Sequence, residues 1–166
     1  MFATPSALCR LHREMRTLGN IIWHLPFLGF VSAIITYLFG LILTLTVLAA
    51  PIGLGLMEHG KFLFAPFSFA MVSKEQLRPS RSTSGWQVYS TLVMVLYLPI
   101  GLLLAAISVV QIVALFCSLV GIPAAIVVAK SLGTYVNPVG KQCVPQAVAD
   151  EIQRRESVSH VRRHLR

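Results

Sequence analysis

Two long stretches of this chain carry no Asp, Glu, Lys or Arg, and they restrict the fold more than any other feature. They span residues 17–57 and 82–129. A membrane-spanning helix needs about 20 apolar residues, so each stretch is long enough for a pair of helices, or for one long helix and a shorter partner. Neither stretch shows the period-two alternation of β-barrel strands. We therefore expect an all-α integral membrane protein, in which helices satisfy their own backbone polar groups.

The composition supports this class and excludes several others. Charged residues make up 12% of the chain, against about 25% in soluble domains. The net charge of +8 comes from basic residues that flank the apolar stretches, which favours anionic lipid headgroups over nucleic acid as the partner. No His, Cys or acidic residues show metal-ligand or catalytic spacing. We expect no enzyme activity, no cofactor and no metal.

The sequence also suggests a tandem repeat of one membrane unit, in which corresponding residues are separated by a constant number of positions, the offset. The offset is the same for small residues and for prolines, and for Pro51 and Pro123 it is 72 (123 − 51). The pairs that define the repeat are Gly29 and Gly101, Pro51 and Pro123, and Pro66 and Pro138. We predict an integral membrane helical bundle of two tandem helical-hairpin repeats, with about four membrane helices.

The expected organisation follows from the distribution of charge. Its segments are a basic amphipathic N-terminal segment (1–19), membrane repeat 1 (20–72), a basic linker (73–85), membrane repeat 2 (86–140) and a polar basic C-terminal tail (141–166). The polar segments are all rich in Lys and Arg, so the positive-inside rule places them on the same side of the membrane. Each repeat must then leave that side and return to it.

The turn of the first repeat has two candidate positions. A turn near residues 37–40 delivers Glu58, His59 and Lys61 to the headgroup region. A turn near residues 50–53 places the same three residues inside the bilayer, where a charge costs at least ~2.5–3.5 kcal/mol. Both alternatives stay open at this stage.

The candidate functional residues are the ionisable groups in or beside the membrane: Glu58, His59, Lys61 and Lys130. Lys130 stands in the second repeat at the position equivalent to Glu58, so the two can pair between the repeats, or each can extend separately to the headgroups. His59 beside Glu58 suggests a proton or ion path, although Ser131 replaces this histidine in the second repeat. Expected lipid-headgroup contacts are Arg10, Arg13, Arg16, Lys74, Arg78 and Arg81.

Several motifs resemble the YccF family of small bacterial "inner membrane component domain" proteins, which also has members in some protists. They are residues 20–23 (NIIW), 46–51 (TVLAAP), 66–68 (PFS), 118–123 (SLVGIP) and 138–140 (PVG). The resemblance covers about residues 18–144. The first copy departs from the family pattern in having alanines at positions 49 and 50 and a serine at position 68.

The family resemblance implies an integral membrane protein with no established reaction, and the charges Glu58, Lys61 and Lys130 also look like those of the family. We expect a structural or accessory subunit of a larger membrane complex, of the respiratory or ATP synthase type, with contacts to anionic lipid such as cardiolipin. The alternative is a small transporter or channel-forming homo-oligomer of the bacterial inner membrane. The Arg-rich start partly fits a mitochondrial targeting segment and equally fits a basic helix that lies on the membrane, so the mitochondrial inner membrane and the bacterial inner membrane are both candidates.

Overall fold

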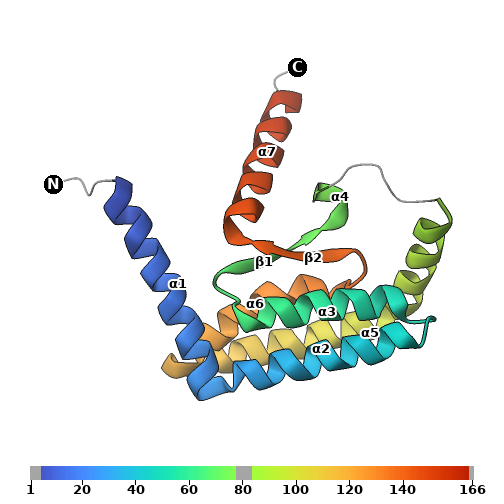
Figure 1. The fold of residues 1–166 in the computed structure, drawn as a ribbon, viewed down its shortest axis with the longest axis horizontal. Coiled ribbons are helices and arrows are strands. Elements are labelled where there is room, and N and C mark those ends of the chain that lie inside the picture. Colours follow the sequence, from blue (N-terminus) through green and yellow to red (C-terminus); the bar gives the residue numbers. More distant parts are fainter. Residues whose placement is uncertain (1–4, 78–83, 165–166) are drawn as a thin grey trace.

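The computed structural model describes residues 5–77 and 84–164, and most of them are helical (Figure 1). In chain order the elements are α1 (Pro5–Phe27), α2 (Gly29–Leu45), α3 (Ala50–Phe64), β1 (Phe69–Ser73), α4 (Lys74–Leu77), α5 (Ser84–Phe116), the short 3₁₀ helix η1 (Leu119–Gly121), α6 (Ile122–Val136), β2 (Lys141–Pro145) and α7 (Gln146–His164). The prediction of an all-α chain is corrected by β1 and β2, which form an antiparallel two-stranded ribbon.

The elements stack in layers (Figure 1). α2 packs against α3 in one hairpin, and the second part of α5 packs against α6 in another. The ribbon lies over α3 and α6, while α2 and the second part of α5 lie on the far side from the ribbon. α1, the first part of α5 and α7 all rise toward the ribbon side. That the polar segments lie on one side of a membrane stays a prediction.

Both hairpins are entered through a bend. The helical segments Arg13–Leu25 and Gly29–Leu45 meet at 79°, because Leu28 adopts a left-handed conformation with φ 49°. α5 is bent in Figure 1, and Pro99 lies inside this helix. A proline in a helix removes one backbone hydrogen bond and kinks the chain. The two bends therefore have different local causes and a similar result.

Within the described residues, two helical segments are long and apolar enough to cross a membrane, Gly85–Phe116 and Leu119–Val136. The bent pair formed by α1 and α2 adds a third candidate if it is taken as one span. This criterion uses length and composition alone. The predicted count of about four membrane helices stays a prediction.

The first hairpin turns at residues 46–49, between α2 and α3. The alternative of a chain reversal near residues 37–40 is wrong, because these residues lie inside α2. Residues 50–53 come directly after the observed reversal and form the start of α3. Pro51 and Pro123 are the second residues of α3 and α6, where a missing amide proton costs no helical hydrogen bond. Pro66 and Pro138 follow the ends of the same helices and are fully buried.

Element bounds in the two halves of the chain differ by a constant offset. α3 and α6 are each 15 residues long, and their starts differ by 72 (122 − 50). β1 and β2 are offset by the same amount (141 − 69). The ribbon pairs Met71 with Cys143 at its centre, and the offset between these two residues is again the same (143 − 71).

The core lies where both hairpins meet α1. Its buried apolar members are Trp23 from α1, Ala33 from α2, Phe62 and Leu63 from α3, and Ala124 and Val127 from α6. A smaller cluster of Val72, Val144 and Ala149 joins the ribbon to the first turns of α7. The core thus links elements from both halves, whereas most of the outer surface of α2 and α5 remains apolar and exposed.

We predict that the contact between α2 and α3 depends on glycine at position 53. A Cβ atom there would lie 2.6 Å from the carbonyl oxygen of Gly40 and 2.6 Å from the amide nitrogen of Thr44. Gly53→Ala should therefore lower the free energy of unfolding by about 1–3 kcal/mol, measured in mild detergent, because backbone atoms must move apart.

Gly133→Ala is the matched control, because a Cβ atom at this helical position meets nothing within 4 Å. Replacing a helical glycine by alanine should raise the free energy of unfolding by up to about 1 kcal/mol. Equal effects of the two substitutions would contradict the close approach of α2 and α3.

Candidate functional site

Glu58 connects α3 to the ribbon. Its Oε1 accepts a hydrogen bond from Lys61 Nζ at 2.6 Å, and its Oε2 accepts one from the backbone amide of Cys143 at 3.0 Å. The side chain is 22% exposed. Both carboxylate oxygens therefore have partners, one from the same helix and one from a strand that belongs to the other half of the chain.

Lys130 makes the corresponding connection from α6. Its Nζ donates to the carbonyl oxygen of Pro66 at 2.9 Å and to Oε1 of Gln146 at 3.2 Å. The ammonium also lies 5.9 Å from the centre of the Phe67 ring. Pro66 belongs to the turn that precedes β1, so Lys130 reaches from the second half of the chain into the first.

The structure does not show the ion pair between Glu58 and Lys130. Each charge instead bonds a backbone group of the opposite half, at Cys143 and at Pro66. A charge that is partly removed from water is stabilised by a fixed hydrogen-bond partner as well as by an opposite charge. The two residues therefore act as separate anchors between the halves.

His59 is sealed inside the protein. It is 3% exposed, its ring stacks on Phe62 with centres 5.7 Å apart, and the Tyr135 ring meets it edge-on at 5.5 Å. Neither ring nitrogen has a hydrogen-bond partner among the described residues. An unpaired charge is costly in such a place, so the neutral imidazole is favoured. Ser131, at the equivalent position, is fully buried, and its hydroxyl donates to the Val127 carbonyl at 2.9 Å.

A polar clamp that the sequence analysis missed joins α1 to the end of α3. We define it by Asn20, Trp23 and His24. Asn20 Nδ2 donates to Ser68 Oγ at 3.0 Å, and Asn20 Oδ1 accepts from the Phe67 amide at 3.1 Å. The clamp therefore holds the turn that leads from α3 to the ribbon.

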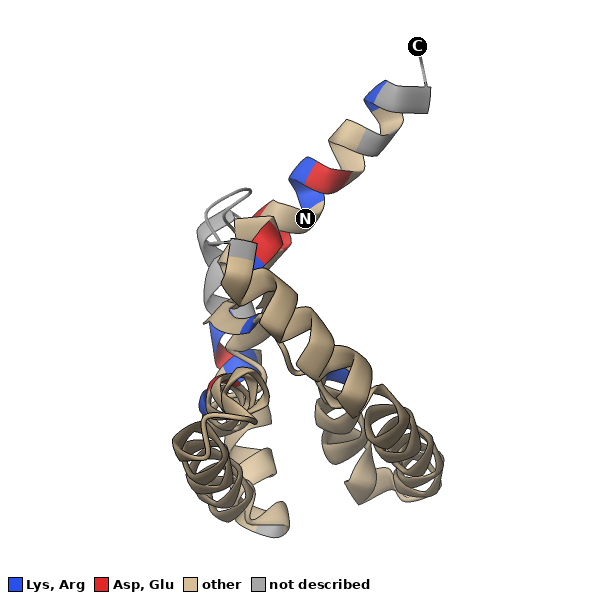
Figure 2. Cartoon of the chain, turned by 90° about the vertical axis from the view of Figure 1, so that its right-hand side faces the viewer, with Lys and Arg blue, Asp and Glu red and all other residues tan. Residues whose placement is uncertain are grey.

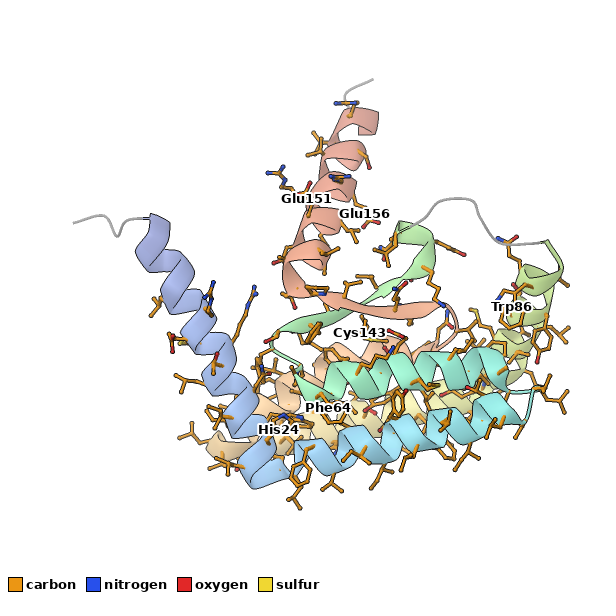
Figure 3. All side chains as sticks on the ribbon, viewed as in Figure 1. His24, Phe64, Trp86, Cys143, Glu151 and Glu156 are labelled. Carbon is orange, nitrogen blue, oxygen red and sulfur yellow. The ribbon has the colours of Figure 1, made fainter. Side chains whose placement is uncertain are left out.

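The remaining clamp bonds satisfy carbonyl groups at the end of α3. Trp23 Nε1 donates to the carbonyl oxygen of Leu63 at 3.0 Å, and His24 Nε2 lies 2.8 Å from that of Phe64. Figure 3 shows His24 and Phe64 meeting where α1 approaches α3. The last carbonyl groups of a helix have no partner within the helix, and the clamp supplies one for each of these two.

The signal for the clamp was present in the sequence. Positions 20, 23 and 24 follow the i, i+3, i+4 spacing that puts side chains on one helical face. Trp and His at the start of an apolar stretch are also typical of a membrane interface, which hides this signal. The equivalent positions of the second half carry Leu92, Val95 and Leu96, so the clamp is specific to the first half. In the second half the Tyr97 hydroxyl donates to the Tyr135 carbonyl at 3.1 Å.

The expected lipid contacts lie on the ribbon side or fall outside the described residues. Arg13 and Lys74 are exposed, and Arg16 is half-buried and close enough to Lys130 for the two charges to interact. Arg78 and Arg81 lie outside the described residues, as does the side chain of Arg10.

Gly29 and Gly101 occupy close contacts with different neighbours. Gly29 packs against the indole of Trp23, and Gly101 packs against the backbone at the end of α6. Among the described residues, no three His, Cys, Asp or Glu side chains are grouped as a metal site. Cys117 is exposed and Cys143 is half-buried, and both are free thiols.

Residues 18–68 match the YccF family, described as an inner membrane component domain. The matched segment contains the clamp, α2, α3 and the turn before β1. The predicted second copy is not part of the match. The chain matches no curated protein and no solved structure. The family description and the apolar helices together support a membrane protein.

We predict that the clamp contributes measurably to stability. Trp23 is 7% exposed, so Trp23→Phe leaves the Leu63 carbonyl without its indole partner. The free energy of unfolding in detergent should fall by about 1–3 kcal/mol. Trp86→Phe is the control, because Trp86 is 49% exposed, and a change below about 0.5 kcal/mol is expected there.

We also predict that the Cys143 thiol reacts slowly. Burial, together with the negative charge of Glu58, raises the pKa of Cys143 from its usual 9.0 to about 11. Because the thiolate is the reactive form, alkylation at pH 8 should be about 100-fold slower than for an unperturbed thiol. Glu58→Gln should speed the reaction, measured by mass spectrometry in detergent in a Cys9→Ala, Cys117→Ala background. Glu14→Gln on α1 should leave the rate unchanged, and an unchanged rate in Glu58→Gln would contradict the placement of this carboxylate.

Proposed function

We propose that this chain is a non-catalytic membrane protein built by tandem duplication, which serves as an accessory subunit of a larger inner-membrane complex in a bacterium or a mitochondrion. It anchors in lipid through its hairpins, contacts anionic headgroups through the ribbon side, and binds a partner subunit through α7. The single observation that carries this function is that α7 packs on the ribbon through its first turns, keeps a hydrogen bond from Gln76 of α4 to Glu156 at 2.9 Å, and extends beyond these contacts away from the membrane-type core.

The duplication is supported by the constant offset of the elements. α3 and β1 have counterparts of equal length in the second half, α6 and β2, and the ribbon pairs two equivalent residues at its centre. An antiparallel pair centred on equivalent residues is what a two-fold axis through the ribbon requires. The anchors also cross between the halves, because Glu58 and Lys130 each bond the opposite half, although their partners Cys143 and Pro66 are not separated by the offset of 72.

α7 has the features of a docking helix. After its contacts at Ala149 and Ile152, residues 153–159 are exposed. Side-chain pairs such as Arg155 with Glu151 at 2.9 Å stabilise the helix on its own, as expected for a polar helix that bridges between bodies. Val158 and Val161 are 54% and 59% exposed and lie three positions apart on one face.

Contact with anionic lipid is supported by the distribution of charge. Figure 2 shows Lys, Arg, Asp and Glu on α7, around the ribbon and on the adjoining helix faces, whereas the lower parts of both hairpins carry none. Arg16 on α1 lies close enough to Lys130 on α6 for the two positive charges to interact, so positive charge gathers on this side. A cardiolipin headgroup offers two phosphates to such a place.

The transporter or channel alternative has no supporting observation among the described residues. Glu58 uses both carboxylate oxygens in structural contacts. His59 is enclosed by aromatic rings, and its ring nitrogens have no described neighbour to pass a proton to. A relay needs a continuous series of exchangeable groups, and the accessory role needs none.

The experiment is native mass spectrometry of the full chain purified in mild detergent from its own membrane. We expect unlike subunits bound to the chain, and Val158→Glu with Val161→Glu should reduce their amount at least tenfold. Ser159→Glu, on a different face of α7, is the matched control. A homo-oligomer without unlike subunits would overturn the accessory role.

A further inference from the structure

The outermost layer of the protein is apolar, exposed and without charge. α2 and α5 contain no Asp, Glu, Lys or Arg, and their outward side chains include Phe30, Leu38 and Leu103, which are 45%, 50% and 62% exposed. The charged anchors and the ribbon lie on the other side of α3 and α6. The boundary between polar and apolar surface therefore runs parallel to the hairpin axes.

This arrangement decides how the hairpins are oriented in a bilayer. If the hairpin axes ran along the membrane normal, Glu58, Lys61 and the ribbon would sit at lipid depth beside them, and each central charge costs at least ~2.5–3.5 kcal/mol. If the axes lie in the membrane plane, every described charged group stays on one side. The layer beneath the charges is two helices deep, about 20 Å at 8–10 Å per packed helix, whereas the hydrocarbon core is about 30 Å thick.

The hairpin tips support the same orientation. Residues 46–49 and 117–120 turn the chain without a charged side chain, and Leu48 and Leu119 are 81% and 85% exposed. A loop that emerged into water on the far side would not need so much exposed apolar surface. Several backbone amides of the tips have partners, as a bilayer demands: those of Val47 and Ser118 donate to the carbonyl groups of Thr44 and Leu115 at 3.3 and 3.1 Å.

Tyr89 shows that the first tip does not reach the far side. Its hydroxyl lies 2.6 Å from the carbonyl oxygen of Val47 and 2.9 Å from that of Leu48. Tyr89 is only five residues from the start of α5 at Ser84 (89 − 84), about 7.5 Å of helix. That start follows the basic linker, so the tip lies within a short distance of the polar side and not about 30 Å away.

We infer that the hairpins lie in the plane of the membrane within the leaflet on the ribbon side, and that the exposed surface of α2 and α5 is covered by the acyl chains of that leaflet. The occupant of this surface is lipid hydrocarbon. The basic ribbon side faces the anionic headgroups, so the opposite, apolar side faces the acyl chains. The chain is then embedded from one side without crossing. The inference rests on the proposed membrane location and is independent of any partner subunit.

The test is a depth profile along the outer face of α2. Phe30→Cys, Leu38→Cys and Leu45→Cys are made one at a time in the full chain with Cys9, Cys117 and Cys143 replaced by alanine. Each is labelled with a bimane and reconstituted in vesicles that contain anionic lipid and nitroxide-labelled lipids of graded depth. In-plane helices predict the same depth for all three probes, within about one helix radius of ~5 Å.

A helix along the membrane normal predicts a spread of about 22 Å from Phe30→Cys to Leu45→Cys, at 1.5 Å per residue, and this result would overturn the inference. Ser159→Cys on α7 is the control and should not be quenched by any lipid probe. The inference would also be overturned if the protein did not float with the vesicles in a density gradient. Absence of unlike subunits in the native mass spectrum would affect the accessory role alone. Circular dichroism confirms that each variant retains its helices.

Discussion

Backbone groups at helix ends and in turns need a hydrogen-bond partner when their surroundings are apolar. Much of this structure is explained by which side chains supply these partners. Trp23 and Tyr97 donate to carbonyl groups near the ends of α3 and α6, and Tyr89 contacts those of the first hairpin tip. Lys130 donates to the Pro66 carbonyl in the turn before β1, and Glu58 accepts from the Cys143 amide in the ribbon. Water cannot serve this purpose at lipid depth, so side chains from distant parts of the chain must, and these bonds fix how the elements are arranged.

The sequence predicted the mostly helical class, because this follows from the length and hydropathy of the apolar stretches. It did not predict the ribbon. Residues 69–73 and 141–145 are too short and too mixed in character to indicate strands on their own, and their pairing depends on two halves meeting. The partners of Glu58 and Lys130 were missed for a related reason. The sequence does not show which backbone groups a charged side chain will bond. Each charged residue was therefore considered only as a partner for an opposite charge.

The two halves differ in how they enter their hairpins, and the difference lies in a few residues. In the first half α1 ends at Phe27, before the left-handed Leu28, and is fastened by the clamp. In the second half α5 continues through Pro99 as one helix. The clamp falls inside the segment that matches the family, and its absence from the second half accompanies the absence of a match there. Under the proposed duplication, a unit without the clamp still folds against its twin, because the ribbon and the anchors hold both.

An in-plane arrangement also resolves the conflict that the sequence posed between hairpin length and charge. A first hairpin that turns at residues 46–49 seemed to require Glu58 and Lys61 inside the bilayer, with the cost of buried charge. That cost arises only if depth increases along the helix. When the axis lies flat, depth is set by helical face and not by position along the chain, so α3 can keep Glu58 toward the ribbon while α2, packed beneath it, faces lipid. Segments with the length and composition of a membrane span are then compatible with a protein that enters one leaflet. The length of an apolar helix determines how much of its surface lipid can cover, and it does not determine how the helix is oriented in the membrane.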